Sequence, residues 1–171
     1  MNEFSPGLAG VVAFETEIAE PDKEGGELRY RGVNIEELVG HVPFEQVWGW
    51  LVDEAFEPGL PAAYCELEQR TGSYIGDLQS ALAALSGKWR LGQFIDIDDD
   101  QAKEDLRRLS AAALSIVAQS ARGADLPAVA EETVLEGRTA AERFLLAWRG
   151  EVDERHARAI DTYWICTAEH G

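Results

Sequence analysis

The sequence predicts an all-α fold with a small N-terminal β-hairpin, arranged as one unit over residues 1–171. From Asn34 onward, apolar residues recur at the three- and four-residue spacing of helices almost throughout. Residues typical of strands gather before Gly32 and are interrupted by turn residues. Apolar residues make up 46% and charged residues 27% of the chain, which suits a packed core with a solvated surface. No internal repeat or low-complexity linker divides the chain.

The predicted β element covers residues 7–32. Val11–Phe14 leads into a strand at Thr16–Ala19, and Glu27–Arg31 forms the returning strand. Between them, Pro21–Gly26 combines the fixed φ of proline with the positive φ that glycine tolerates, which is the chemistry of a turn. We therefore expect a hairpin in this part of the chain.

Helices are predicted over most of the remaining sequence. Asn34, with Glu37 three residues later, resembles a capping box that opens the first of them. Pro43 suits the first residue of a helix, and Gly87 suits a helix end. The predicted helices are Ile35–Val39, a helix from Pro43 that carries Phe44, Val47, Trp48, Leu51 and Val52 inward, Pro61–Arg70, Asp77–Leu85, Asp99–Ala121, Ala128–Glu136, Thr139–Arg149 and a final helix after Asp153.

The longest predicted helix, Asp99–Ala121, has one face directed at a core. Its Ala111–Ala113 stretch lets a neighbouring helix approach closely, because alanine side chains are small, and Ala81–Ala84 has the same property. The residues expected on the core face are Leu106, Leu109, Ala113, Ile116, Val117 and Ser120.

The final helix, which Asp153 is suited to cap, ends in polar residues. Glu169 and His170 follow an otherwise apolar stripe, and this ending has two interpretations. A buried helix can deliver its polar end to a functional site, or the helix simply returns to water with a histidine at the negative end of its dipole. For a lone histidine the second is the commoner case, and the residues alone leave both open. The stripe expected in the core is Ile160, Tyr163, Trp164 and Thr167.

The charge balance bounds the partners of the protein. Its net charge is −17, from 32 acidic and 15 basic residues, which argues against a nucleic acid or an anionic membrane surface. No apolar run approaches the ~20 residues of a membrane helix, and residues 1–6 lack signal-peptide features. Cys65 and Cys166 are interpreted as small buried hydrophobes within helices, in a reducing compartment, and not as a disulfide. We expect a cytoplasmic protein.

The common catalytic and metal-binding motifs are missing. Neither a Walker sequence nor a Gly-x-Ser-x-Gly elbow occurs, and the histidines and cysteines form no cluster, so no metal is predicted. Asp96, Asp98 and Asp100 match three ligand positions of a calcium loop. Gln101 and Arg107, however, stand where such a loop needs glycine and a bidentate glutamate. We therefore interpret these aspartates as an acidic cap of the long helix.

Two segments carry a family resemblance. Gly7–Ile18 reads Gly-Leu-Ala-Gly-Val-Val-Ala-Phe-Glu-Thr-Glu-Ile, and Gly26–Leu38 contains Arg-Tyr-Arg-Gly followed by Ile-Glu-Glu-Leu. In order and spacing these pieces resemble the N-terminal region of bacterial citrate synthases. Within that family the likeness is greatest to the actinobacterial enzymes called citrate synthase 2.

The resemblance covers nearly the whole chain but only the first part of the family's length. It continues at Phe44–Trp48, returns at Thr139–Leu145 and Ala159–Asp161, and ends at Thr167–His170, where the family usually has His-Ala-Asp-His. Between these matches, Cys65–Gly123 is similar only in its helical character. The resemblance therefore implies the N-terminal part of the large, helical domain of a citrate synthase.

The implied reaction is an acyl transfer of the tricarboxylic acid cycle, in which acetyl-CoA condenses with oxaloacetate to give citrate and free CoA. Family members are homodimers, and the alanine-rich helix faces would suit such packing. A 2-methylcitrate synthase that uses propionyl-CoA would look the same over this region. A truncated, non-catalytic helical module for dimerisation or binding is the rival hypothesis from a different class.

Only one functional residue is carried over from the family. Its second histidine binds oxaloacetate, and His170 matches it, whereas Thr167 and Glu169 replace the first histidine and the aspartate. The catalytic aspartate, the two catalytic histidines and the arginines that clamp the substrate carboxylates match nothing in residues 1–171. The resemblance thus implies no catalytic residue, no metal and no cofactor in this chain, with acetyl-CoA as a substrate.

Overall fold

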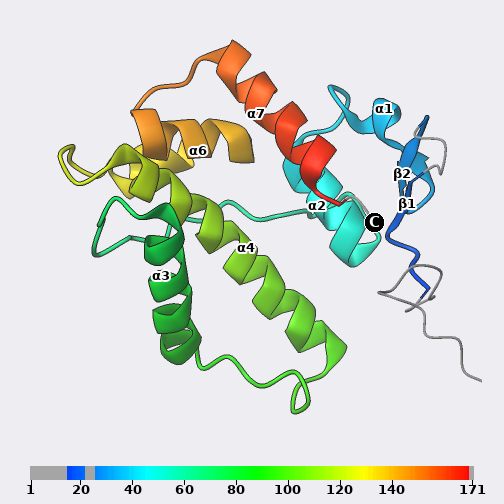
Figure 1. The fold of residues 1–171 in the computed structure, drawn as a ribbon, viewed down its shortest axis with the longest axis horizontal. Coiled ribbons are helices and arrows are strands. Elements are labelled where there is room, and N and C mark those ends of the chain that lie inside the picture. Colours follow the sequence, from blue (N-terminus) through cyan, green and yellow to red (C-terminus); the bar gives the residue numbers. More distant parts are fainter. Residues whose placement is uncertain (1–14, 22–25, 170–171) are drawn as a thin grey trace, which may run out of the picture.

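Figure 1 shows the computed structural model of the chain, which describes residues 15–21 and 26–169. The predicted strand residues Val11–Phe14, the turn residues 22–25 and His170 lie outside the described residues. A small sheet followed by helices confirms the predicted all-α class with a small N-terminal β element. The described elements are β1 (Ala19–Pro21), β2 (Leu28–Tyr30), β3 (Val33–Asn34), α1 (Ile35–Leu38), α2 (Phe44–Asp53), α3 (Tyr74–Trp89), α4 (Asp99–Arg122), α5 (Glu131–Leu135), α6 (Ala140–Arg149) and α7 (Glu154–Thr167).

The sheet has the order β1–β2–β3, and both neighbouring pairs are antiparallel. Tyr30 of the middle strand lies opposite Ala19 on one side and Val33 on the other. Arg31 and Gly32 connect β2 to β3 with positive φ values of 47° and 82°, as two-residue hairpin turns prefer. The third strand was not predicted, because two residues carry no detectable alternation.

Short polar side chains cap five of the helices within the described residues. The predicted caps Asn34 and Asp153 are confirmed, since each accepts a hydrogen bond from a backbone N–H in the first turn. Pro43 was predicted to be the first residue of the next helix, but it is the N-cap of α2, which begins at Phe44. The capping side chains belong to Asn34, Ser73, Asp98, Thr139 and Asp153.

The helix predicted over Pro61–Arg70 is absent, and this segment has neither helix nor strand. Side chains of α4 satisfy its backbone instead. Gln119 Nε2 donates to the carbonyl of Cys65 at 2.7 Å, and the N–H of Leu67 donates to Gln119 Oε1 at 3.0 Å. Ser115 Oγ accepts the N–H of Cys65 at 3.1 Å. These tertiary hydrogen bonds outweigh the helical propensity of the segment.

Two other helices have different bounds from those predicted. The helix predicted at Asp77–Leu85 is longer in both directions, because Ser73 caps it and Gly87 lies inside it instead of ending it. A glycine inside a helix costs only about 1 kcal/mol relative to alanine, so the helix continues to Arg90, which has a left-handed conformation (φ 54°). The helix predicted at Ala128–Glu136 is shorter, and only α5 forms.

Three groups of buried apolar residues hold the elements together. In Figure 1, α3 and α6 both lie near the C-terminal end of α4, α7 packs on α6, and α2 and the strands lie beside the end of α7. We call the group between the strands, α2 and α7 the tip cluster: Ala19, Tyr30, Leu38, Val47 and Ile165. The second group, between α3 and α4, contains Leu67, Leu85, Ala112 and Ile116, and the third contains Ala118, Val134 and Ala147.

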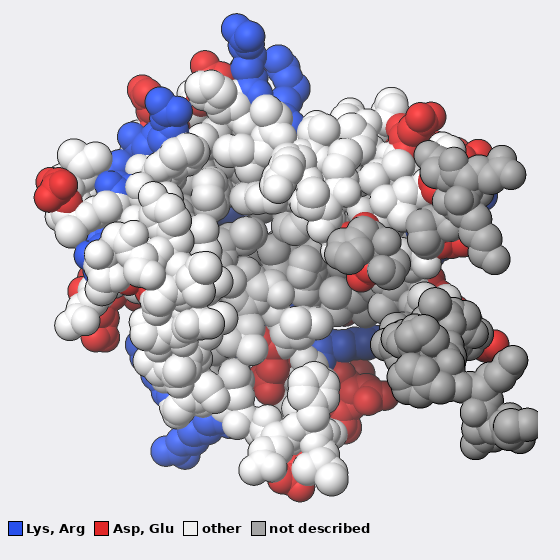
Figure 2. All heavy atoms as spheres, viewed as in Figure 1, with Lys and Arg blue, Asp and Glu red and all other residues white. Residues whose placement is uncertain are grey.

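Several surface residues differ from expectation. Leu106 was predicted to face the core but is exposed, and Cys166 is exposed on α7. Cys65 is partly buried, but in the non-helical segment; both thiols are free. Ala111 and Ala112 are buried within this chain. Charged side chains lie mostly toward the edges of the face in Figure 2, whose middle is largely uncharged.

Candidate substrate-binding tip of the last helix

His170, the only side chain predicted to bind substrate, follows helix α7 in the chain, so the end of α7 is the described part nearest to it in sequence. The core stripe predicted for α7 is wrong in part. Tyr163 is 66% exposed and Thr167 is exposed, whereas Ala157 and Ile165 are buried. Trp164 is half-buried as predicted and lies 5.2 Å from two phenylalanine rings on α2 and α6. The apolar face of α7 therefore lies about one residue further along the helix than the sequence pattern indicates.

The end of α7 is fastened by a tyrosine from the opposite end of the chain. The hydroxyl of Tyr30 donates to the carbonyl oxygen of Ile165 at 2.8 Å and lies 3.0 Å from that of Glu169. In return the backbone N–H of Glu169 donates to Tyr30 Oη at 3.3 Å. The last carbonyls of a helix lack the usual N–H four residues further on, and at Ile165 this hydroxyl adds a partner to the N–H of Ala168 at 3.4 Å.

Tyr30 itself is held rigidly. It is 0% exposed, and the indole N–H of Trp50 on α2 donates to its carbonyl at 2.8 Å. The adjacent Arg31 donates through Nε to the carbonyl of Leu51 at 2.9 Å. Burial raises the pKa of the Tyr30 hydroxyl, so at neutral pH it keeps its proton and remains a donor.

A second contact joins α7 to α2. Asp161 Oδ1 accepts the backbone N–H of Phe44, the first residue of α2, at 2.8 Å. Pro43, the N-cap of that helix, makes no capping hydrogen bond with its side chain, so Asp161 caps α2 from another helix. Burial raises the pKa of Asp161, and the hydrogen bond from Phe44 opposes that shift. Glu45 of α2 in turn accepts the N–H of Ala140 at 3.2 Å, at the start of α6.

The predicted site residues can now be placed. Thr167, where the family has its first histidine, donates its hydroxyl to the carbonyl of Tyr163 at 2.8 Å and is exposed. Glu169 is half-buried, and its backbone is the part that contacts Tyr30. His170 follows Glu169 in the chain but lies outside the described residues, so its role stays a prediction. Sequence reasoning missed Tyr30, although it stands in the Arg-Tyr-Arg-Gly turn that carried the resemblance.

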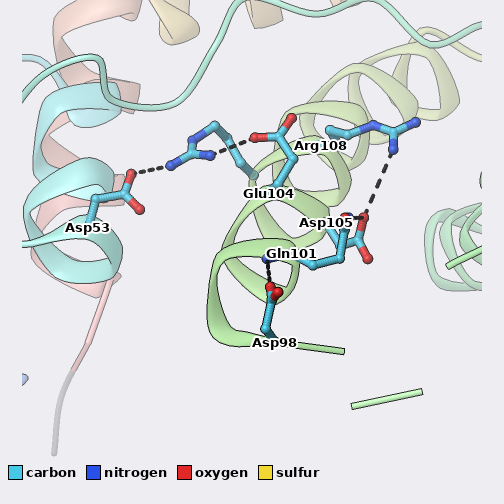
Figure 3. A network of polar contacts seen from close by, with 7 residues as sticks. Asp53, Asp98, Gln101, Glu104, Asp105 and Arg108 are labelled. Carbon is cyan, nitrogen blue, oxygen red and sulfur yellow. Dashed lines mark hydrogen bonds and ion pairs between the residues drawn. The ribbon is translucent and has the colours of Figure 1, made fainter. Parts of the chain in front are cut away.

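The acidic residues before α4 act as a helix cap. Asp98 accepts the N–H of Gln101 at 2.8 Å (Figure 3), and Asp99 and Asp100 lie in the first turn. This confirms the interpretation of an acidic cap. Arg107, in the place of a calcium-ligating glutamate, forms ion pairs of 2.7 Å with Asp53 of α2 and Glu104. Among the residues that the structure describes, no three histidine, cysteine or acidic side chains are grouped to hold a metal ion.

Two surface hollows lie along these helices. One, of about 430 Å³, lies between residues 40–43 and the first turns of α6 and α7, and charges of both signs line it. Arg138 in its wall pairs with Glu142 at 2.6 Å, so these two charges already satisfy each other. The other hollow, of about 490 Å³, lies between residues 64–69 and α3. No helix of the described part is long and apolar enough to cross a membrane.

The all-α architecture is that of a known class of enzymes. A crystal structure of citrate synthase from Thermotoga maritima matches with a TM-score of 0.65 over 96% of this chain and 46% of that chain. The two are 23% identical, so this likeness establishes the fold alone. A family model described as "Citrate synthase, C-terminal domain" matches residues 7–171. The chain belongs to the citrate synthase family.

Similar curated proteins agree with this assignment. A protein of Mycobacterium bovis named "Putative citrate synthase 2" is 52% identical over 170 residues, and a protein of the same name from Mycobacterium tuberculosis is equally similar. The match covers 98% of this chain but 46% of each relative, so the chain spans less than half of their length. A citrate synthase of Acidithiobacillus ferridurans is 40% identical over 68 residues, 34% of this chain and 18% of that protein.

Proposed function

We propose that this chain is the N-terminal part of the large domain of an enzyme that condenses acetyl-CoA with oxaloacetate to citrate and CoA. The observation that carries the proposal is the 52% identity to the mycobacterial proteins over 98% of the chain. The anchored end of α7 supports it, because His170, which in sequence matches the oxaloacetate-binding histidine of the family, follows shortly after that end in the chain. His170 is the proposed substrate-binding residue.

The chemistry of the family requires groups that residues 1–171 do not supply. There, an aspartate removes a proton from the acetyl methyl group, one histidine stabilises the resulting enol, and another protonates the keto oxygen of oxaloacetate. General acid–base groups of this kind each contribute typically about 10²- to 10⁴-fold. Residues 1–171 alone should therefore show no measurable citrate formation.

The decisive experiment compares this chain with the longest protein that its reading frame encodes, both purified from a host without citrate synthase. Release of CoA is measured with oxaloacetate and either acetyl-CoA or propionyl-CoA. We expect turnover by the longer protein with a higher kcat/KM for acetyl-CoA. A preference for propionyl-CoA would instead identify a 2-methylcitrate synthase. No condensation with either thioester would overturn the proposal in favour of a non-catalytic helical module.

The role of His170 is tested in the same assay. A hydrogen bond from a charged donor to a substrate carboxylate or keto oxygen is worth about 1.5–3 kcal/mol. In the longer protein, His170→Ala should therefore raise the KM for oxaloacetate about 10- to 100-fold and leave that for acetyl-CoA nearly unchanged. His156→Ala is the matched control, since His156 lies exposed in the first turn of α7. Equal effects of the two substitutions would return His170 to a structural role.

We also propose that the complete enzyme is a homodimer. Of the two alanine-rich faces, Ala111 and Ala112 already pack within this chain, whereas Ala83 and Ala84 of α3 are exposed. Exposed Tyr74 extends the apolar surface of α3. Sedimentation at micromolar concentration checks this proposal, and a monomer would contradict it.

A further inference from the structure

We infer that Tyr30 is a positioning residue for oxaloacetate binding, which its hydroxyl serves by fixing the backbone at the end of α7. The inference rests on the proposed function of His170. The hydroxyl lies within hydrogen-bond distance of the carbonyls of Ile165 and Glu169, the second of which immediately precedes His170 in the chain. A residue from β2 thereby controls a segment 135 residues further on.

The end of α7 needs this support because it lacks the usual stop. Helix α6 ends at Gly150 in a left-handed conformation, which turns the chain sharply and satisfies the last carbonyls. At the end of α7, Ala168 keeps a right-handed helical conformation, and its N–H reaches the carbonyl of Ile165 at a long 3.4 Å. The hydroxyl of Tyr30 is the closer partner of that carbonyl, at 2.8 Å.

The surroundings of the hydroxyl make the contact specific. The ring of Tyr30 packs in the tip cluster with Leu38 and Val47, where a phenylalanine would fill nearly the same space. Burying a hydroxyl without a hydrogen-bond partner costs free energy, and the backbone at the end of α7 supplies the partners of this one. The hydroxyl contacts the backbone of Ile165, Ala168 and Glu169, at the end of α7 and just beyond it. The oxygen therefore acts on the direction in which the chain leaves α7.

The consequence for binding is geometric. A displacement of about 1 Å in a group that contacts substrate can cost up to 100-fold in rate. Loss of the hydroxyl should weaken the binding of oxaloacetate, through His170, and leave the binding of acyl-CoA unchanged. A residue with a merely structural role would lower the fraction of folded protein, and with it the apparent kcat, without raising the KM for either substrate.

The test substitutes Tyr30→Phe in the catalytically active protein that contains this chain and compares it with Tyr64→Phe. Tyr64 is the matched control, because its partly buried hydroxyl also lies near a backbone carbonyl, that of Val129 at 3.3 Å, away from the tip cluster. We expect Tyr30→Phe to raise the KM for oxaloacetate about tenfold, with less than a twofold change for acyl-CoA. Equal changes for both substrates, or the same change in Tyr64→Phe, would overturn the inference.

A second readout needs no substrate and separates this inference from the proposed function. The chain has three histidines, so the ring signals of His41, His156 and His170 can be followed together by NMR in residues 1–171. Tyr30→Phe should shift the His170 signals and leave the other two in place. Unchanged His170 signals would refute the positioning role, whatever reaction is catalysed. A shift at His170 in a protein without condensing activity would refute the proposed function alone.

Discussion

In the tip region, formed by β1–β3, α1, α2 and α7, segments 135 residues apart meet through apolar side chains and one tyrosine hydroxyl. In the arm, formed by residues 61–73, α3 and α4, a segment without helix or strand lies on α4 through polar side chains. Gln119, 1% exposed, holds the backbone on both sides of Glu66. The first arrangement depends mainly on burial of apolar surface, and the second on satisfied backbone hydrogen bonds.

A substitution should therefore destabilise the two regions for different physical reasons. In the tip region a lost methylene leaves a cavity, and the cost grows with the volume that the surroundings cannot refill. In the arm a lost side-chain oxygen or nitrogen leaves a buried backbone group without a partner, and the cost is its desolvation. The two regions are linked by the ion pair of 2.7 Å between Arg107 of α4 and Asp53 of α2 (Figure 3).

The largest expected effect is in the tip cluster. Ile165→Ala should lower the free energy of unfolding by about 2–5 kcal/mol, because Ile165 is 0% exposed between the strands and α2. Ile75→Ala is the matched control: the same side chain on α3 is 72% exposed, and the change should stay within about 0.5 kcal/mol. Urea unfolding of the purified chain measures both. Equal losses would mean that burial of Ile165 contributes little to stability.

The second effect, in the arm, should be smaller. Gln119→Ala removes the partner of the Leu67 N–H and the closer of the two partners of the Cys65 carbonyl, which should cost about 1–3 kcal/mol. Hydrogen exchange should also become faster at the Leu67 amide. Gln69→Ala changes an exposed glutamine of the same segment and serves as the control. Unchanged protection of Leu67 in Gln119→Ala would show that the segment is held by its apolar contacts instead.

The sequence predicted some elements of these regions correctly and others wrongly. The long helix α4 and its acidic cap were predicted correctly, because Asp98 and the apolar repeat are local signals. The class of fold followed from helical spacing over most of the chain. The family followed from motifs in Gly7–Ile18, most of which lies outside the described residues, and in Gly26–Leu38, which contains β2, β3 and α1. The helix predicted at Pro61–Arg70 is wrong, because Gln119, about 50 residues away, decides the conformation of that segment.

The candidate site was predicted only in outline. His170 could be named from the family motif, but nothing local marks Tyr30 as the partner of the last helix, since the contact spans 135 residues. The core stripe of α7 was misplaced for a related reason. Tyr163 is as apolar as its neighbours, and which face of the helix is covered depends on where α2 and α6 lie.

The pH dependence of stability should differ between the two regions, because the pKa values of Asp77 in the arm and Asp161 in the tip region shift in opposite directions. In the arm, Asp77 accepts hydroxyl hydrogen bonds from Ser120 and Thr71, both at 2.6 Å, and these lower its pKa. Asp77 therefore adds stability above the ordinary aspartate pKa of about 3.9, and the gain is lost as pH falls. In the tip region, burial raises the pKa of Asp161, so its contribution to stability is lost as pH rises above about 3.9.

The smallest expected effect follows from this opposition. Asp77→Asn should flatten the rise of the free energy of unfolding below about pH 5, whereas Asp161→Asn should remove a fall of that free energy above about pH 4. At pH 7, Asp161→Asn should change stability by less than about 1 kcal/mol, because the amide oxygen still accepts the N–H of Phe44. Urea unfolding at several pH values measures both slopes. Slopes that change in the same direction would contradict the environment assigned here to Asp161, and with it the cap that joins α7 to α2.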